Sequence, residues 1–302
     1  MVLFPGGYRQ IRARDQLRRS SREEAGNSGG LHHICGRDGE EADRFVEGKR
    51  CTGGVTGCLK IDILTIFPEM VQTYLRTSIL GRAVDRSLLQ AQAVDLRKYS
   101  TDRHGKVDDY PYGGGHGMVM CPGPIFDAVT ELRKDSEATV ILMSPGGKTF
   151  DQAAARELSG LPHLVLICGH YEGVDERVRE HLVDREVSLG DFILTGGELA
   201  ALAVTDAVAR LLPGVLAEDS AREESFEEFL LEYPQYTRPQ EYMGWRVPEV
   251  LLSGHHAEIR RWRRREAIRR TLNLRPDLIG RAGFSEEDAQ ILAEVRKIAN
   301  AS

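Results

Sequence analysis

The residues best suited to bind a ligand lie in one glycine-rich stretch, residues 164–197. It contains two short apolar runs, residues 164–168 and 192–194, and glycines follow each of them. Apolar runs of this length are typical of strands buried on both faces of a parallel sheet, and ligands bind where such strands end. Glycines let a ligand approach the backbone without an intervening side chain. The stretch therefore predicts a cofactor pocket that includes Gly169, Gly173, Gly190, Gly196 and Gly197.

One arginine stands out in the helix pattern that follows, over residues 198–212. The pattern is apolar almost all round, which is typical of a helix buried on every side, here by the sheet together with a second subunit. Asp206 and Arg210 are spaced i, i+4, and such a pair simply stabilises a helix. Charged groups are nevertheless rarely buried without a specific partner, so Arg210 is also a candidate functional residue.

Residues 217–228 are polar and acidic, and they are interpreted as part of a linker between two domains. Most acidic linkers are merely solvated. A linker between domains can also deliver a carboxylate into a cleft. Both interpretations remain open from the residues alone.

The most basic segment of the chain is residues 255–270, which hold seven arginines against two glutamates. Apolar residues at helical spacing give this segment one packed face, and the arginines occupy the others. A local excess of five positive charges in a protein of net charge −6 favours contacts with phosphates over an ordinary solvated surface. The segment therefore predicts a nucleic-acid contact.

The elements that must position these groups alternate between strand and helix patterns. Strands are predicted at 59–67, 89–96, 140–143, 164–168 and 192–194, and one helix runs from Pro68 to about Gly81. This alternation indicates an α/β fold with a parallel sheet. Residues 102–118 are too long, polar and glycine-rich for a plain connection and are predicted to form a functional loop.

Composition excludes several other classes of protein. The 302 residues are 41% hydrophobic, enough for a packed core, and no apolar run approaches the roughly 18 residues of a membrane helix. Five cysteines without a CxxC pair argue against a disulfide framework or a zinc ribbon, so we expect a cytoplasmic protein without membrane contact. Residues 1–58 are charged and poor in apolar periodicity, and we expect a disordered N-terminal extension there. It is interpreted as a basic arm that touches RNA, a targeting segment, an unstructured tail, or an upstream stretch included by the choice of start site.

Seven segments in order resemble the bacterial tRNA (guanine-37-N1)-methyltransferases of the SPOUT, or α/β-knot, superfamily. They are DILTIFPE from Asp62, PYGGGHG from Pro111, LMSPGG from Leu142, CGHYEGVDER from Cys168, LGDFILTGGE from Leu189, YTRP from Tyr236 and HAEIRRW from His256. The resemblance covers about residues 59–278. It implies a parallel sheet with a deep trefoil knot over residues 59–216, a linker over 217–232, and a small all-helical tRNA-binding domain over 233–302.

The resemblance also implies which residues act. S-adenosylmethionine would be bound in the knot of a homodimer, in a pocket lined by Leu142, Ser144, Pro145, Gly169, Tyr171, Glu172, Leu189, Gly190, Phe192, Leu194, Gly196 and Gly197. Arg210 matches the arginine that contacts the target guanine. Glu224 stands where the family usually has an aspartate as general base, with Asp219 and Glu223 as alternatives. The tRNA with guanine at position 37 would contact His256, Arg260, Arg261 and Arg264.

Magnesium is reported to help the family, and Glu172 is a residue near the pocket that such an ion could approach. Nothing in the sequence fixes a metal site. Two rival interpretations are a knot methyltransferase acting on ribose 2′-oxygen and an RNA-binding protein without catalysis. The YTRP and HAEIRRW segments argue against the first, and the glycines, Arg210 and the carboxylate of Glu224 argue against the second.

Overall fold

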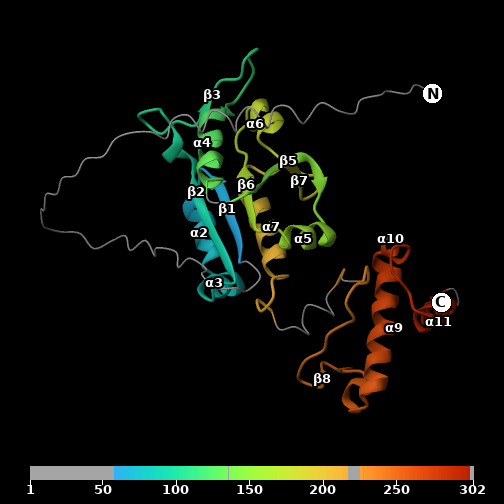
Figure 1. Cartoon of the computed structure of the whole chain (residues 1–302). Helices are drawn as coiled ribbons and strands as arrows, with labels where there is room; N and C mark the ends of the chain where they lie inside the picture. The colour runs from blue at the N-terminus through green and yellow to red at the C-terminus, as the bar shows by residue number, and fades with distance from the viewer. Residues whose placement is uncertain (1–57, 135, 217–224, 227, 300–302) are drawn as a thin grey trace, which may run out of the picture. The chain divides into compact units, whose positions relative to one another are not determined.

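A computed structural model describes residues 58–299 except 135, 217–224 and 227, and it contains an α/β part and a C-terminal part (Figure 1). The α/β part is built on a five-stranded parallel sheet with strand order β2-β1-β6-β5-β7. Its strands are β1 (Leu59–Thr65), β2 (Leu89–Asp95), β5 (Thr139–Thr149), β6 (His163–Cys168) and β7 (Arg185–Ser188).

Helices cover both faces of this sheet, as Figure 1 shows. Alternate residues of β6 enter two different hydrophobic clusters: Leu164 and Leu166 on one face, Val165 and Ile167 on the other. Because both faces are covered, every residue of β6 is buried, which explains why its sequence is continuously apolar. The helices are α2 (Pro68–Leu75), α3 (Ser78–Asp85), α4 (Pro122–Leu132), α5 (Gln152–Ser159), α6 (Glu176–His181) and α7 (Glu198–Ala209), with a short 3₁₀ helix η1 (Leu96–Tyr99).

The single helix predicted from Pro68 to Gly81 is in fact two helices, α2 and α3. The break falls where Ser78 adopts a φ of 52°, a left-handed conformation that an α-helix cannot continue through. Gly81 does not end a helix. It lies inside α3, where an added Cβ would be 2.4 Å from the carbonyl oxygen of Arg76, so its role is to allow this close approach.

The strand predicted over residues 192–194 is also wrong. Phe192 and Ile193 are 55% and 80% exposed and belong to a loop. The fifth strand of the sheet is instead β7, an edge strand in which Val187 is the one apolar residue. An edge strand needs less apolar sequence than a central one, so β7 has a weak strand pattern. The strand was therefore predicted at the more apolar residues 192–194 instead.

Two irregular segments reach toward the same end of the sheet. Strand β5 is interrupted between Met143 and Lys148, where its pairing with β7 shifts register. Residues 102–118 form the predicted loop; β3 (Asp108–Asp109) lies within it and pairs with β4 (Val119–Met120), which follows directly after it. Both segments therefore add irregular backbone where the parallel strands end.

The C-terminal part is mainly helical. It comprises the 3₁₀ helix η2 (Glu249–Leu252), α9 (His256–Leu274), α10 (Pro276–Ile279) and α11 (Glu286–Ala299), packed around a small core of Leu230, Ile268, Ile279, Ile291 and Val295. It is not entirely helical, because β8 (Glu241–Tyr242) and β9 (Trp245–Arg246) form a short hairpin. Met243 and Gly244 both have positive φ in its turn, as a tight two-residue hairpin turn requires.

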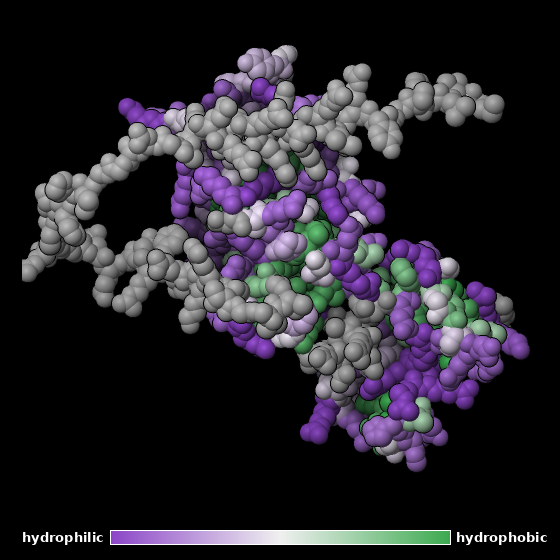
Figure 2. All heavy atoms as spheres, viewed as in Figure 1, coloured by the Kyte–Doolittle hydropathy of each residue, from purple (hydrophilic) through white to green (hydrophobic). Residues whose placement is uncertain are grey.

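The two parts differ in surface character. Figure 2 shows hydrophilic residues over most of the C-terminal part and a larger apolar area on the α/β part. No helix in the part of the chain that the structure describes is long and apolar enough to cross a membrane.

Candidate active site

A pocket of about 350 Å³ lies at the carboxyl ends of β5, β6 and β7, where ligands bind to parallel sheets. Three loops form it: the irregular part of β5, the turn that follows β6, and the loop between β7 and α7. Its lining residues are Met143, Ser144, Pro145, Gly169, His170, Tyr171, Glu172, Gly173, Val187, Ser188, Leu189, Gly190, Phe192, Ile193, Leu194, Thr195, Gly196, Gly197 and Ala200.

Close backbone contacts hold these loops together. The N–H of Gly197 donates a 2.8 Å hydrogen bond to the carbonyl oxygen of Gly169. A Cβ added at Gly197 would lie 2.8 Å from the Cα of Cys168, and one added at Gly147 would lie 2.4 Å from the backbone nitrogen of Val187. At these two positions only glycine fits, so the pocket wall depends on backbone packing rather than on side chains.

Eleven of the twelve residues that the resemblance implied for cofactor binding line this pocket. Leu142 is the exception. It is 4% exposed and packs in the core on one face of the sheet with Val140 and Ile167. The pocket predicted from the sequence did not include Met143, His170, Val187, Ser188, Ile193, Thr195 or Ala200, most of which are adjacent in sequence to a residue that it did include.

Side chains exposed around the pocket are mostly apolar or aromatic. Phe192, Ile193 and Leu194 project from the loop before α7, and Tyr171 follows β6. The imidazole ring of His170 lies edge-on to Phe67 and Tyr171, with ring centroids 5.2 and 4.8 Å apart. The pocket therefore offers flat rings and backbone groups, which suit a ligand with an aromatic portion.

The glycine-rich loop over residues 102–118 is attached to the same pocket. The N–H of Glu172 donates to the carbonyl oxygen of Met118 at 3.0 Å, and the N–H of Met120 donates to that of Gly173 at 2.9 Å. Gly117 leaves room for the side chain of Glu172, whose nearest atom would be 2.4 Å from an added Cβ. The predicted functional loop thus supports the turn that carries Tyr171 and Glu172.

A buried carboxylate and a buried thiol lie at the base of the pocket wall. The hydroxyl of Thr65 donates a 2.8 Å hydrogen bond to Glu198, the first residue of α7. Burial, together with the negative charge of Glu198, raises the pKa of the Cys168 thiol well above its usual value. Cys168 is therefore protonated at neutral pH and is not a nucleophile.

Arg210 does not line the pocket. It caps the carboxyl end of α7, whereas the pocket lies at the amino end of that helix, about 18 Å away for twelve residues at about 1.5 Å each. The neighbouring Asp206 accepts a 3.5 Å hydrogen bond from the hydroxyl of Tyr74, and its charge raises the pKa of that tyrosine. Glu224, Asp219 and Glu223, the proposed bases, lie outside the described residues.

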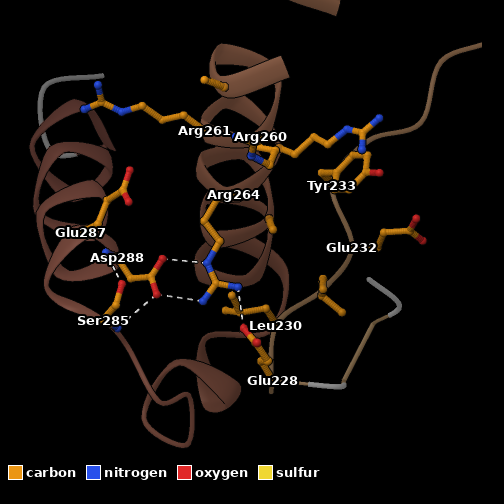
Figure 3. A pocket seen from close by; sticks show the side chains of 14 residues that line it. Glu228, Leu230, Glu232, Tyr233, Arg260, Arg261, Arg264, Ser285, Glu287 and Asp288 are labelled. Atoms are coloured by element: carbon orange, nitrogen blue, oxygen red, sulfur yellow. Dashed lines mark hydrogen bonds and ion pairs between the residues drawn. The ribbon is translucent and has the colours of Figure 1, made fainter. Parts of the chain in front are cut away.

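The four residues predicted to contact tRNA all lie on α9, but they differ in surroundings. His256, Arg260 and Arg261 are exposed. The guanidinium of Arg264 lies in a second cavity, of about 670 Å³, where it forms ion pairs with Glu228 and Asp288 (Figure 3). Of the four side chains, that of Arg264 is therefore already engaged by carboxylates.

One further cluster of polar side chains serves the sheet. Asp62 in β1 accepts hydrogen bonds from His163 and Gln92, each at 2.7 Å, and Ser136 lies 2.6 Å from the other ring nitrogen of His163. Burial alone would raise the pKa of Asp62, but these bonds and the charge of Lys60 outweigh burial and lower the pKa. His163 begins β6, so this cluster lies toward the amino ends of the strands, opposite the pocket. We interpret it as structural.

No metal centre is formed by the residues that the structure describes, since none of their His, Cys, Asp and Glu side chains gather in groups of three or more that could hold an ion. What the geometry does define is a class of protein: an α/β protein with a backbone-lined ligand pocket at the carboxyl ends of its parallel strands, followed by an arginine-rich helical part.

Residues 59–281 match the family model described as tRNA (Guanine-1)-methyltransferase TrmD. The chain therefore belongs to this family of methyltransferases. A tRNA (guanine-N(1)-)-methyltransferase of Halalkalibacterium halodurans is 54% identical over 242 residues, which cover 79% of this chain and 98% of the relative. One from Moorella thermoacetica is 56% identical over 243 residues, covering 79% and 97%, and one from Caldanaerobacter subterraneus is 56% identical over 234 residues, covering 77% and 97%.

Proposed function

We propose that this methyltransferase transfers the methyl group of S-adenosylmethionine to N1 of guanine 37 in tRNA. The observation that carries the proposal is the pocket, because eleven residues expected to hold the cofactor converge on it from three separate loops. Family membership supplies the reaction and the tRNA substrate. We further propose that the chain is threaded as a trefoil knot through these loops and that the protein acts in the cytoplasm.

The residues of the pocket fit S-adenosylmethionine. Its glycines leave a backbone cradle that a Cβ would fill, and the rings of Phe192 and Tyr171 offer flat surfaces for an adenine. When bound, the cofactor supplies an electrophilic methyl group on a sulfonium. Glu172 is the carboxylate at the pocket beside which a helper magnesium ion would lie, while no residue is assigned as a metal ligand.

Two side chains outside the pocket would act on the guanine. N1 carries a proton that must leave as the methyl arrives, and Glu224 is proposed to accept it as a general base, a role that contributes about 10²–10⁴-fold. Asp219 and Glu223 remain alternatives. Arg210 is proposed to stabilise the negative charge that develops on O6 of the guanine.

The position of Arg210 supports a homodimer. Within one subunit it lies a helix length from the pocket, so a second subunit is needed to bring an Arg210 close to each cofactor. Exposed apolar side chains suitable for such an interface occur beside the pocket and on α2 and α7, namely Phe67, Met70, Ile193 and Leu199. In the dimer, the acidic linker and the C-terminal part of one chain would complete the pocket of the other.

We propose the domain limits accordingly: an N-terminal extension over residues 1–58, a methyltransferase domain over 59–216, a linker over 217–232, and a tRNA-binding domain over 233–302. The exposed residues His256, Arg260 and Arg261 would contact the tRNA backbone.

Methyl transfer to a tRNA with guanine 37 and to the same tRNA with adenine 37 tests the proposal. Primer extension should stop at position 37 of the first tRNA alone, because N1 methylation blocks base pairing. Arg210→Ala and Glu224→Gln should each abolish transfer and leave cofactor binding nearly intact. Full activity of Glu224→Gln would move the base to another carboxylate, and a wild-type protein that does not bind the cofactor would favour the RNA-binding alternative.

A further inference from the structure

Arg264 holds two carboxylates that come from different segments of the C-terminal part (Figure 3). Its Nε and Nη2 atoms donate to the two carboxylate oxygens of Asp288 at 2.7 and 2.8 Å, and its Nη1 atom donates to Glu228 at 2.7 Å. The pair with Asp288 is bidentate, which is the strongest geometry for an arginine and a carboxylate. These hydrogen bonds lower the pKa of Asp288 to about 2, so the pair is charged throughout the neutral range.

Asp288 is itself fixed at the start of α11. Its carboxylate accepts a 3.1 Å hydrogen bond from the N–H of Ser285, and the hydroxyl of Ser285 accepts one of 3.2 Å from the N–H of Asp288. This reciprocal pair is a capping box, which ties the first turn of a helix to the residue before it. The Asp288 side of the contact is therefore rigid, and α9 is joined to α11 through it.

Glu228 belongs to a segment that is packed against the same helices. Two residues later, Leu230 is 5% exposed and lies in the small core with Ile268. The N–H of Leu231 donates a 2.8 Å hydrogen bond to the hydroxyl of Thr271 on α9. Of the contacts between this segment and α9, the ion pair of Glu228 with Arg264 lies nearest in sequence to Glu224.

The charges around Arg264 make it a poor phosphate contact. One guanidinium is paired with two carboxylates, so the cluster carries a net charge of about −1, and a phosphate would have to displace one of them. Arg260 and Arg261, one turn earlier on α9, are exposed, and no ion pair joins either to another residue that the structure describes.

We propose that Arg264 is a positioning residue rather than a tRNA contact. It clamps Glu228 to α9 and α11 and so fixes the point at which the linker enters the C-terminal part. Glu224, the proposed base, precedes Glu228 by four residues in the sequence. Losing the clamp would therefore loosen the base relative to the C-terminal part, and the role rests on the proposed function.

Glu228→Gln is the most informative variant, because the Glu228 side chain is 64% exposed and its loss costs little stability. We expect the single-turnover rate of methyl transfer to fall on the order of tenfold, as a slightly misplaced catalytic group causes. The dissociation constants for tRNA and cofactor and the melting temperature should not change. Glu241→Gln, which removes the exposed pair with Arg246 in the β8–β9 hairpin, is the matched control and should keep the wild-type rate.

Arg264→Lys and Arg261→Lys then separate a clamp from a phosphate contact. Lysine keeps the charge that a phosphate needs but cannot form the bidentate fork. As a clamp, Arg264→Lys should lower the single-turnover rate, whereas Arg261→Lys should keep both the rate and the salt dependence of tRNA binding. Arg264→Met should leave the slope of log affinity against log salt unchanged, while Arg261→Met should lower its magnitude by about 0.7–0.9.

Two results would overturn the clamp while leaving the proposed function standing: a wild-type rate in Glu228→Gln, or a reduced salt slope in Arg264→Met. A wild-type protein that transfers no methyl group to tRNA would instead overturn the proposed function, and the positioning role with it. A melting temperature that falls in Glu228→Gln in step with the rate would show a merely structural contact.

Discussion

The pocket and helix α9 expose different chemical groups. The pocket wall consists of backbone, glycines and apolar rings, and its dimensions depend on close contacts such as that of Gly197 with Cys168 and Gly169. Helix α9 presents long charged side chains to solvent, and its contribution to the second cavity is mainly from arginines, namely Arg260, Arg261, Arg263 and Arg264. Under the proposed function, the pocket would recognise its ligand by shape and α9 would recognise tRNA by charge.

Because of this difference, the two regions should respond differently to salt and to added side-chain volume. A backbone-lined pocket tolerates changes in salt but not an added methyl group, because protein interiors cannot absorb extra volume cheaply. A charged helix face tolerates changes in side-chain volume but weakens as salt screens its charges. Variants that add volume in one region and remove charge in the other should therefore have separate effects.

Of the variants that test this comparison, Gly197→Ala is expected to have the largest effect. Its Cβ would lie 2.8 Å from the Cα of Cys168 and 3.0 Å from the nitrogen of Gly169, so backbone must move at the pocket wall. Overpacking of this kind costs about 1–3 kcal/mol, and we expect cofactor affinity to fall by up to about a hundredfold, measured by isothermal titration calorimetry. Gly123→Ala is the control, because nothing lies within 4 Å of its added Cβ. Equal affinities for the two variants would show that the wall is not rigid.

A smaller effect is expected from Arg260→Glu combined with Arg261→Glu. Both side chains are exposed, and their reversal should weaken tRNA binding about tenfold at moderate salt and flatten its salt dependence. Cofactor affinity should not change, since the two arginines do not line the cofactor pocket. Binding of tRNA measured by fluorescence anisotropy over a salt series checks this. Unchanged binding would remove this face of α9 from the tRNA interface.

The smallest effect concerns acid stability. Arg264 lowers the pKa of Asp288 to about 2, so the folded protein holds this carboxylate charged more firmly than the unfolded chain does. The resulting stability is present above the unfolded pKa of about 3.9 and is lost as the pH falls toward 2. Between pH 5 and pH 2.5, Asp288→Asn should therefore lose less stability than the wild type, as followed by helical circular dichroism. Parallel losses would mean that the ion pair adds no stability.

Particular residues explain which elements could be predicted from the sequence and which could not. Strands β1 and β6 were predicted correctly because burial on both faces leaves a continuous apolar run. Strand β7 was missed because an edge strand carries a weak pattern, and its place was given to the exposed run at Phe192. Leu142 was placed in the pocket by its motif, although side chains alternate along a strand and this one points into the core.

The surroundings of Arg264 were beyond any sequence pattern. Its two partners, Asp288 and Glu228, lie 24 and 36 residues away, and no periodicity relates such positions. In the sequence, Arg264 is one of seven arginines in residues 255–270. Only the folded structure shows that Arg264 is paired with carboxylates. Counts of positive charge therefore predicted a nucleic-acid contact for the whole segment, which stays a prediction, and could not separate its arginines.

The protonated thiol of Cys168 gives the pocket a built-in chemical reporter. It is buried at the end of β6, directly beneath the backbone of Gly197. Because the side chain is fully buried, an alkylating reagent can reach it only when the packing at this end of β6 opens, so its labelling rate measures how often that happens. A ligand that bridges the loops of the pocket should slow this labelling. The labelling rate of Cys168 would then report how often the pocket opens, although the raised pKa of its thiol keeps it from acting as a nucleophile in the folded protein.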